Sequence, residues 1–141
     1  MSSALENLCG PGKPLSQEAF DMREFEGLLR SGRARLDDAR TASLSVEGRF
    51  DLAYNAAHAL SLAALRRLGY RASHRYIVFQ VLPHTLGLGP EVWRVLAKAH
   101  DRRNLGEYEG LLDIDERFVT DVIAACTAVA NAIDRVGAKD A

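Results

Sequence analysis

Apolar residues recur every three or four positions along most of this chain, which is the spacing of one face of an α-helix. The pattern predicts five helices, over residues 16–39, 45–68, 73–82, 90–109 and 113–133. No run of useful length alternates apolar and polar residues with period two, so we expect no sheet. The chain is therefore predicted to be all-α.

Polar residues that favour helix starts accompany several of these segments. Ser16, Ser45 and Ser73 stand where the first three helices are expected to begin, and Asp113 stands before the fifth. Side-chain oxygens at such positions accept hydrogen bonds from the free N–H groups of the first helical turn. We expect these four residues to act as N-caps.

Short connections between the long helices favour antiparallel neighbours. We therefore predict an up-and-down antiparallel bundle of four long helices plus one shorter helix, over residues 15–137. Residues 1–14 end in a Gly-Pro-Gly-Lys-Pro run, which is typical of chain without regular structure. We expect flexible tails at 1–14 and 138–141.

Composition narrows the class of protein. The chain has 141 residues, of which 48% are hydrophobic and 26% charged, as in an ordinary single-domain globular protein.

No apolar run approaches the roughly 20 residues of a membrane span, so we expect no membrane partner. The first ten residues lack a basic start and a long apolar stretch, so we expect no signal peptide. Two cysteines, Cys9 and Cys126, form neither a disulfide framework nor a zinc spacing, and a cytoplasmic location fits best.

The formal net charge of -1 argues against a broad nucleic-acid platform, because such proteins usually carry a strong basic excess. Any RNA contact would have to be local. No glycine-rich phosphate loop occurs, and the four histidines lie in separate helices or loops. Asp51, Asn55 and His58 fall on one line of the second helix, opposite its apolar face, but they lack the carboxylates of a di-iron bundle. We expect no cofactor and no metal.

The densest group of chemically active side chains lies in the predicted helix 90–109. The apolar stripe of this helix, continued by four residues, arrives at Arg103. An arginine in that position is either paired with a carboxylate or placed at an interface, because an unpaired buried charge is unfavourable. His100, Asn104 and Tyr108 share a second line, and Glu107 lies one turn from Arg103. The group is therefore either a solvated Arg103–Glu107 ion pair or a functional site.

Several sequence phrases, in this order, resemble the HEPN superfamily of small all-α domains. They are LDDA (36–39), GRFDLAYNAAH (48–58), LGY (68–70), SHR (73–75) and RNLGEY (103–108). The resemblance covers residues 16 to 135. It implies a bundle that forms a homodimer, and in many members a metal-independent endoribonuclease of a toxin–antitoxin or defence system.

The family signature is an arginine, a polar residue and, a few residues later, a histidine, which line a cleft shared by two subunits. By resemblance, Arg103 would hold the scissile phosphate, Asn104 would orient the phosphate or Arg103, and Tyr108 takes the place of the family histidine. His100, Arg102 and Glu107 are accessory candidates, and His100 could supply the missing imidazole.

The tyrosine changes the expected chemistry, because a phenol with a pKa of about 10 is a poor base at neutral pH. Tyr108 would act as an acid or hydrogen-bond donor, or stack on a base, or mark a site that has lost catalysis. Two functions remain open. One is an RNA-associated domain, as a ribonuclease or a degenerate ribonuclease. The other is a non-catalytic dimerisation or protein-interaction module that docks a partner encoded nearby, such as a nucleotidyltransferase.

Overall fold

Helices make up most of the described protein, which confirms the expectation of a mainly helical fold. The computed structural model describes residues 3–110 and 113–137, without the side chains of Ser3, Tyr108 and Glu109. The predicted tail at 138–141 lies outside the described residues. The elements are α1 (Ser3–Asn7), β1 (Leu15–Gln17), α2 (Met22–Ala39), α3 (Val46–Arg67), β2 (Tyr70–Ala72), α4 (Arg75–Gln80), α5 (Leu82–Thr85), α6 (Pro90–Glu109) and α7 (Glu116–Val136).

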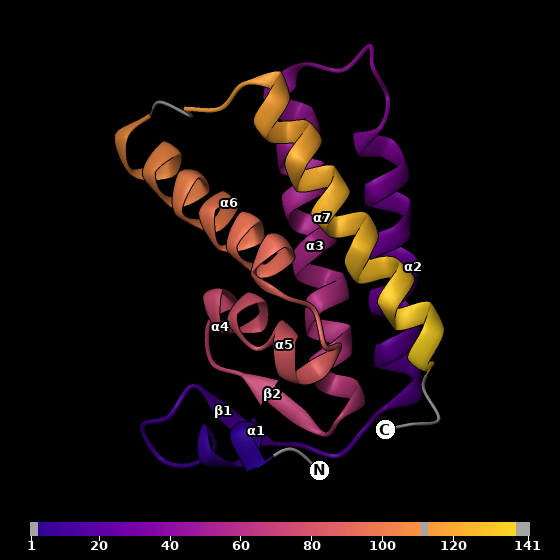
Figure 1. Ribbon diagram of the computed structural model, residues 1–141, viewed down its shortest axis with the longest axis vertical. Coiled ribbons are helices and arrows are strands. Elements are labelled where there is room, and N and C mark those ends of the chain that lie inside the picture. Colours follow the sequence, from indigo (N-terminus) through magenta and orange to yellow (C-terminus); the bar gives the residue numbers. More distant parts are fainter. Residues whose placement is uncertain (1–2, 111–112, 138–141) are drawn as a thin grey trace.

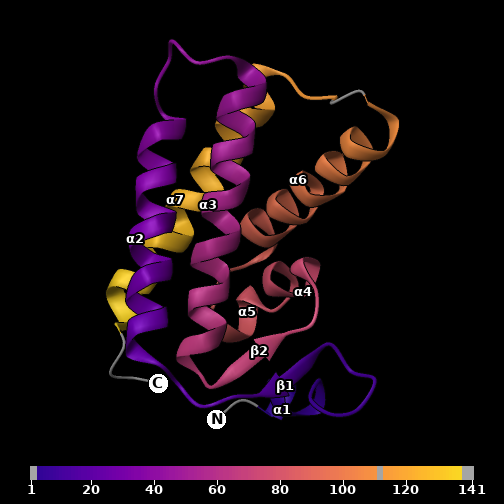
Figure 2. The same ribbon diagram turned by 180° about the vertical axis from the view of Figure 1, so that it is seen from behind.

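Three of the long helices, α2, α3 and α7, run side by side, whereas α6 is inclined to them (Figures 1 and 2). Helix α3 is the central element and contacts α2, α7, α6, α4, α5 and β2. Its inward positions are mostly small residues that are almost completely buried, including Ala53, Ala57 and Ala64. Small side chains let the neighbouring helices approach the α3 backbone closely, which explains how one helix can contact so many others.

The closest of these approaches joins α2 to α3 at Gly32. A Cβ atom added at Gly32 would lie 2.7 Å from Cγ of Leu60, far inside ordinary contact distance. Helix α2 runs through this glycine without a break. The residue therefore makes room for Leu60.

Local capping follows the prediction at one helix and differs at others. Ser45 caps α3 as expected and accepts a hydrogen bond from the Gly48 N–H. Helix α2 is instead capped by Asp21, and α7 by Asp115, which accepts from the Phe118 N–H. Both predicted starts therefore lie too early: α2 is capped by Asp21 and not by Ser16, and α7 is capped by Asp115 and not by Asp113.

The predicted flexible tail at 1–14 and the absence of a sheet are both contradicted in the described residues. Strand β1 pairs antiparallel with β2, with Leu15 opposite Ala72. The side chains of Leu5 and Leu15 are 0% and 1% exposed, so the segment contributes to the core. Each strand has three residues, which is too short to produce a recognisable alternation. Ser73 follows β2 and donates its N–H to the Pro14 carbonyl, so it continues the strand pair and does not cap α4.

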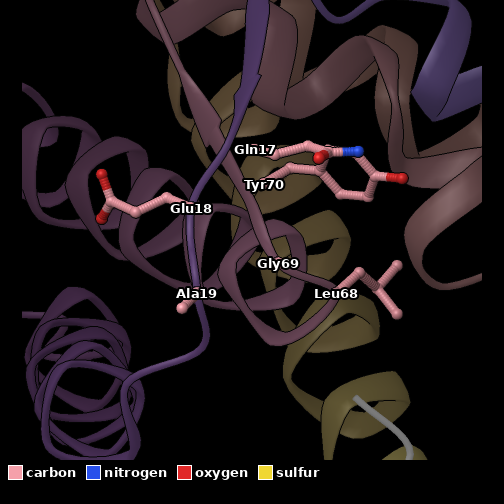
Figure 3. Close-up of a pocket in the computed structure, with 6 residues that line it drawn as sticks. All are labelled: Gln17, Glu18, Ala19, Leu68, Gly69 and Tyr70. Carbon is pink, nitrogen blue, oxygen red and sulfur yellow. The ribbon is translucent and has the colours of Figure 1, made fainter.

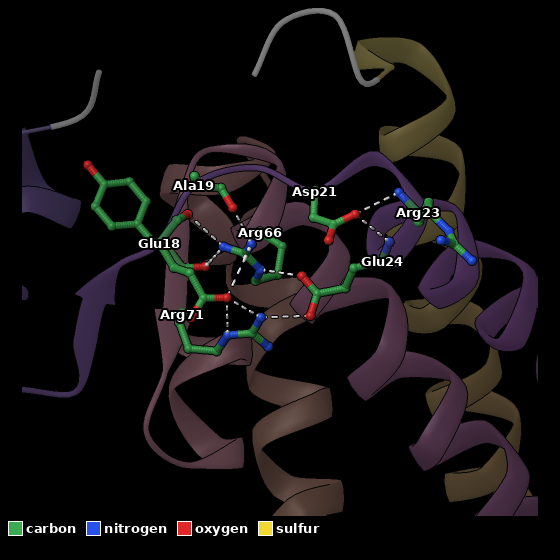
Figure 4. A network of polar contacts seen from close by, with 8 residues as sticks. Glu18, Ala19, Asp21, Arg23, Glu24, Arg66 and Arg71 are labelled. Atoms are coloured by element: carbon green, nitrogen blue, oxygen red, sulfur yellow. Dashed lines mark hydrogen bonds and ion pairs between the residues drawn. The ribbon is translucent and has the colours of Figure 1, made fainter.

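A buried arginine joins this strand pair to the helices (Figure 4). The Arg66 side chain is 1% exposed and donates to Glu24 Oε1 at 2.6 Å. It also donates to the backbone carbonyls of Glu18 at 2.8 Å, Ala19 at 2.6 Å and Tyr70 at 3.2 Å. Arg71 adds a bond to Glu24 Oε2 at 2.7 Å. The network holds the chain entering α2 against the end of α3.

None of the helices in the described part of the chain combines the length and apolar character that crossing a bilayer requires.

Candidate functional site

The side chains with the most promising chemistry meet where α3, α4 and α6 come together. The hydroxyl of Tyr54 on α3 lies 2.9 Å from Nδ1 of His100 on α6. The other ring nitrogen, Nε2, lies 3.0 Å from Nδ2 of Asn104, one turn further along α6. Hydrogen bonds at both ring nitrogens fix the orientation of the imidazole. We call Tyr54, Arg75, His100, Arg103 and Asn104 the His100 cluster.

Local sequence explains how α6 presents these groups. Pro90 occupies the first turn, where its missing N–H has no intrahelical partner to lose. Regular helix then places His100 and Asn104 four positions apart on the same face. Tyr54 is 0% exposed, and its ring packs against Phe79 with the centroids 6.0 Å apart. The buried phenol thus provides a rigid support for the half-buried imidazole.

The hydrogen bonds also indicate which ring nitrogen is basic. An amide N–H₂ of Asn104 can only donate, so Nε2 accepts and carries the lone pair. Nδ1 of the neutral ring then carries the proton and donates to the Tyr54 oxygen. This assignment follows from the amide orientation. Asn104 is exposed, so the basic nitrogen lies on the solvent side of the ring.

Arg103 lies over the ring of the same tyrosine. Its guanidinium carbon is 5.0 Å from the centroid of the Tyr54 ring, within the range of a cation–π interaction. Its Nη1 is also 3.0 Å from Glu107 Oε1, so the Arg103–Glu107 ion pair predicted from the spacing is present. The Arg103 side chain is 25% exposed and remains accessible to a ligand.

The electrostatic environment keeps the His100 imidazole neutral at ordinary pH. Burial lowers the pKa of His100, and the positive charges of Arg103 and Arg75 lower it further, against the opposing effect of Asp101. Burial raises the pKa of the Tyr54 phenol, although Arg75 and Arg103 oppose that shift. The neutral imidazole can accept a proton, and the two neighbouring guanidinium groups attract an anion.

A pocket of about 300 Å³ opens beside Arg103, between the start of α3 and the end of α6. Glu47, Asp51 and Glu107 contribute carboxylates to its wall, together with the guanidinium of Arg103. Three carboxylates against one guanidinium make this pocket unfavourable for a polyanion.

The remaining predicted site residues are divided between different surfaces. Arg102 lies outside the His100 cluster: it donates to the Asp113 carbonyl oxygen, and its guanidinium carbon is 5.3 Å from the Phe118 ring centroid. It therefore ties α6 to the start of α7. Tyr108 belongs to α6, but its side chain lies outside the described residues.

Sequence reasoning missed the two partners that come from other elements. Tyr54 belongs to the apolar stripe of α3, and Arg75 starts the short helix α4, so neither stands out locally. The line of Asn55 and His58, expected to face away from the core, is half-buried. The ring of His58 lies 6.4 Å from that of Phe79 on α4, because α4 packs over this side of α3.

A second pocket, of about 350 Å³, lies where the strand pair meets the end of α3 (Figure 3). Glu18 is the charged side chain in its lining, and it points away from Leu68 and Tyr70 toward the ion pair with Arg71. The pocket is therefore a hollow without a charged side chain directed into it.

In residues 3–110 and 113–137, no three His, Cys, Asp or Glu side chains gather as a metal site would require. Comparison of the chain with protein-family models, with curated proteins and with solved structures gives no match in any of the three.

Proposed function

We propose that this chain is a HEPN-like, RNA-associated helical bundle, and that its His100 cluster cleaves RNA without a metal ion. The observation that carries the proposal is the imidazole of His100, which is held by Tyr54 and Asn104 one turn before Arg103. The resemblance of RNLGEY at 103–108 to the family signature supports the choice of RNA as the substrate.

Metal-free cleavage of RNA uses the 2′-hydroxyl of the substrate as the nucleophile. Neutral Nε2 of His100 takes the proton of this hydroxyl, and its oxygen forms a bond to the adjacent phosphorus. The bond from phosphorus to the 5′-oxygen breaks, which leaves a 2′,3′-cyclic phosphate and a 5′-hydroxyl. Arg103 holds the phosphate and stabilises its developing negative charge. In this scheme Tyr108 donates a proton to the departing oxygen.

Asn104 is the hydrogen-bond partner of His100 that the substrate replaces in this mechanism. Its amide occupies the basic nitrogen of His100 in the free protein and lies on the exposed side of the ring. Substrate displaces the amide from Nε2, and the freed Asn104 hydrogen-bonds to the phosphate. The bond from Nδ1 to the buried Tyr54 stays in place and keeps the tautomer fixed.

We further propose that the active form is a homodimer, as the resemblance implies. Arg103 and Tyr108 are five residues apart, which is about 140° around a regular helix. One helix therefore presents them in different directions, and a cleft shared by two copies would combine them. The corresponding biological role is that of a cytoplasmic toxin or defence ribonuclease.

A non-catalytic interaction module is the second candidate. It is favoured by the Arg103–Glu107 ion pair and by the carboxylates of Glu47 and Asp51 in the adjoining pocket. These groups suit a basic protein surface, such as that of a nucleotidyltransferase encoded nearby, better than RNA.

Cleavage of a mixed RNA pool in the presence of a chelator tests the proposal. The variants are Arg103→Ala, His100→Gln and Tyr108→Phe, with Arg94→Ala as a matched control, since Arg94 is an exposed arginine of the same helix. We expect Arg103→Ala and His100→Gln to lose about 10²–10⁴-fold in rate, as is typical of a lost acid–base group, and Arg94→Ala to retain activity. Light scattering reports the oligomeric state in the same samples. Folded wild-type protein that cleaves no faster than Arg103→Ala would favour the interaction module.

A further inference from the structure

A pocket of about 220 Å³ lies between α3, β2 and the start of α4, with Arg75 in its lining. Four basic side chains contribute to its lining: His58, Arg71, His74 and Arg75. Its other lining residues are apolar or hydroxyl-bearing, so its wall contains no carboxylate. In a chain with a net charge of -1, a wall that has two arginines and no carboxylate favours an anionic ligand over a cationic one.

The two arginines differ in how their charge is balanced. Arg71 bonds to the carboxylates of Glu18 and Glu24, so most of its charge is neutralised within the protein. Arg75 has no carboxylate partner among the described residues; its side chain lies 3.5 Å from Asn55 Oδ1 and also interacts with the Tyr54 hydroxyl. It is exposed, and both of these partners are uncharged. Arg75 is thus the uncompensated charge of this pocket.

Two further side chains provide hydrogen bonds. His58 is half-buried, and among the described residues its ring contacts Phe79 without a hydrogen-bond partner at either nitrogen. Burial, with the added charge of Arg75, lowers the pKa of His58 to about 4, so the ring is neutral and one nitrogen carries a proton to donate. The exposed Ser73 hydroxyl lines the same pocket and is a second donor.

We propose that this pocket binds a phosphate group, with Arg75 as the main charged contact and with His58 and Ser73 as hydrogen-bond donors. Arginine matches phosphate oxygens with two parallel N–H groups, which a lysine cannot do. The site is separate from the position of the scissile phosphate at Arg103.

The position of Arg75 connects the pocket to the His100 cluster. Its charge acts on Tyr54 and His100 as well as on His58, so it lies near both the pocket and the cluster. A polynucleotide with one phosphate at Arg103 would pass Arg75 next. We therefore assign the pocket to the phosphate that neighbours the cleaved one. This assignment rests on the proposed ribonuclease function, whereas phosphate binding itself does not.

Nuclear magnetic resonance titration of the isotope-labelled full chain tests both steps. The probes are inorganic phosphate, adenosine 5′-monophosphate and a short single-stranded RNA with 2′-O-methyl sugars, which cannot be cleaved through the 2′-oxygen. We expect saturable shifts of the His58 and Ser73 resonances at millimolar phosphate. Arg75→Gln should weaken this binding about tenfold, as expected for one lost charge-assisted contact, while the matched control Arg94→Gln should not.

The three probes distinguish a free phosphate or mononucleotide from a phosphate of RNA as the ligand. They also test the phosphate site separately from its assignment to the phosphate next to the cleaved one. Tighter binding of the RNA than of the mononucleotide at His58 supports the assignment to the neighbouring phosphate. Tighter binding of the mononucleotide overturns that assignment and retains the phosphate site. Linear, unsaturable shifts, or equal shifts in wild type and a folded Arg75→Gln variant, overturn the site itself. Failure of the cleavage assay alone would remove the ribonuclease and leave these binding results unchanged.

Discussion

Arg66 and Glu24 lie 42 positions apart in the sequence, and their side chains form an ion pair with Nε and Oε1 2.6 Å apart. The arginine is almost completely buried, while the glutamate is 28% exposed. Burial favours the protonated form of Glu24, but hydrogen bonds from Arg66 and Arg71 outweigh it and hold the pKa of this carboxyl below its usual value. The pair therefore anchors the start of α2 to the end of α3.

Replacement of this arginine tests how much the anchor contributes. Arg66→Met keeps a long side chain but leaves Glu24 Oε1 and the carbonyls of Glu18 and Ala19 without the Arg66 donor, while Arg71 still bonds to Glu24 Oε2. Removing one partner of a buried ion pair costs about 3–5 kcal/mol, so we expect a loss of that order in the free energy of unfolding measured with urea. Arg33→Met, which removes the exposed pair with Asp134, is the control and should cost no more than about 1 kcal/mol. Equal losses in the two variants would contradict the anchoring role.

Two glycines of α2 offer a matched test of helix packing. A Cβ at Gly32 would meet Cγ of Leu60 at 2.7 Å, whereas a Cβ at Gly27 meets nothing within 4 Å. Gly32→Ala should therefore destabilise the protein by about 1–3 kcal/mol, as overpacked cores do. Gly27→Ala should stabilise it by about 0.4–1 kcal/mol, because alanine has less freedom in the unfolded chain. Thermal unfolding followed by circular dichroism measures both, and a stabilising Gly32→Ala would show that α2 and α3 are less tightly packed.

The features that could be predicted from sequence are those that depend on neighbouring residues. Ser45 and Pro90 act at helix starts, Ser45 through a hydrogen bond within the first turn and Pro90 because it needs no N–H partner there. The spacing of His100, Arg103 and Asn104 follows from the helix alone. Tertiary contacts could not be predicted in this way. Tyr54 reaches His100 across 46 positions, and nothing in the local sequence distinguishes this tyrosine from an ordinary core residue.

The strand pair was missed for a related physical reason. Its strands are three residues long and are stabilised by distant groups, among them the Arg66 bonds to the Glu18 and Tyr70 carbonyls. A Gly-Pro-rich sequence normally indicates irregular chain, because glycine and proline disfavour helix. Here the same residues allow the chain to turn so that Leu5 and Leu15 both enter the core.

The N-terminal segment is therefore expected to contribute to stability, in contrast to a flexible tail. Leu5→Ala removes a side chain that is 0% exposed, and buried leucines lose about 2–5 kcal/mol on truncation to alanine. Leu44→Ala is the control, because Leu44 is 42% exposed and its truncation should change the free energy of unfolding by less than about 0.5 kcal/mol. Urea unfolding monitored by Trp93 fluorescence measures both. A Leu5→Ala variant as stable as wild type would restore the description of residues 1–14 as a tail.

Protonation of His58 gives the protein a specific dependence on pH. Burial, together with the charges of Arg75, His100 and Arg103, lowers the pKa of His58 to about 4 in the folded protein, against about 6.5 in the unfolded chain. Between these values the unfolded state binds more protons, so stability is full above about pH 6.5 and is lost as the pH falls. From pH 7 to pH 5 the loss from this residue is about 2 kcal/mol, at about 1.4 kcal/mol per unit below the unfolded pKa.

Substitution of the histidine isolates this contribution from that of other groups. His58→Gln has a side chain of similar size that does not titrate, so its stability should fall by about 2 kcal/mol less than that of wild type between pH 7 and pH 5. His100, whose pKa is also lowered, leaves a residual dependence of the same sign in the variant. Parallel profiles for wild type and His58→Gln would mean that the ring is hydrated in the folded protein and that burial does not lower its pKa.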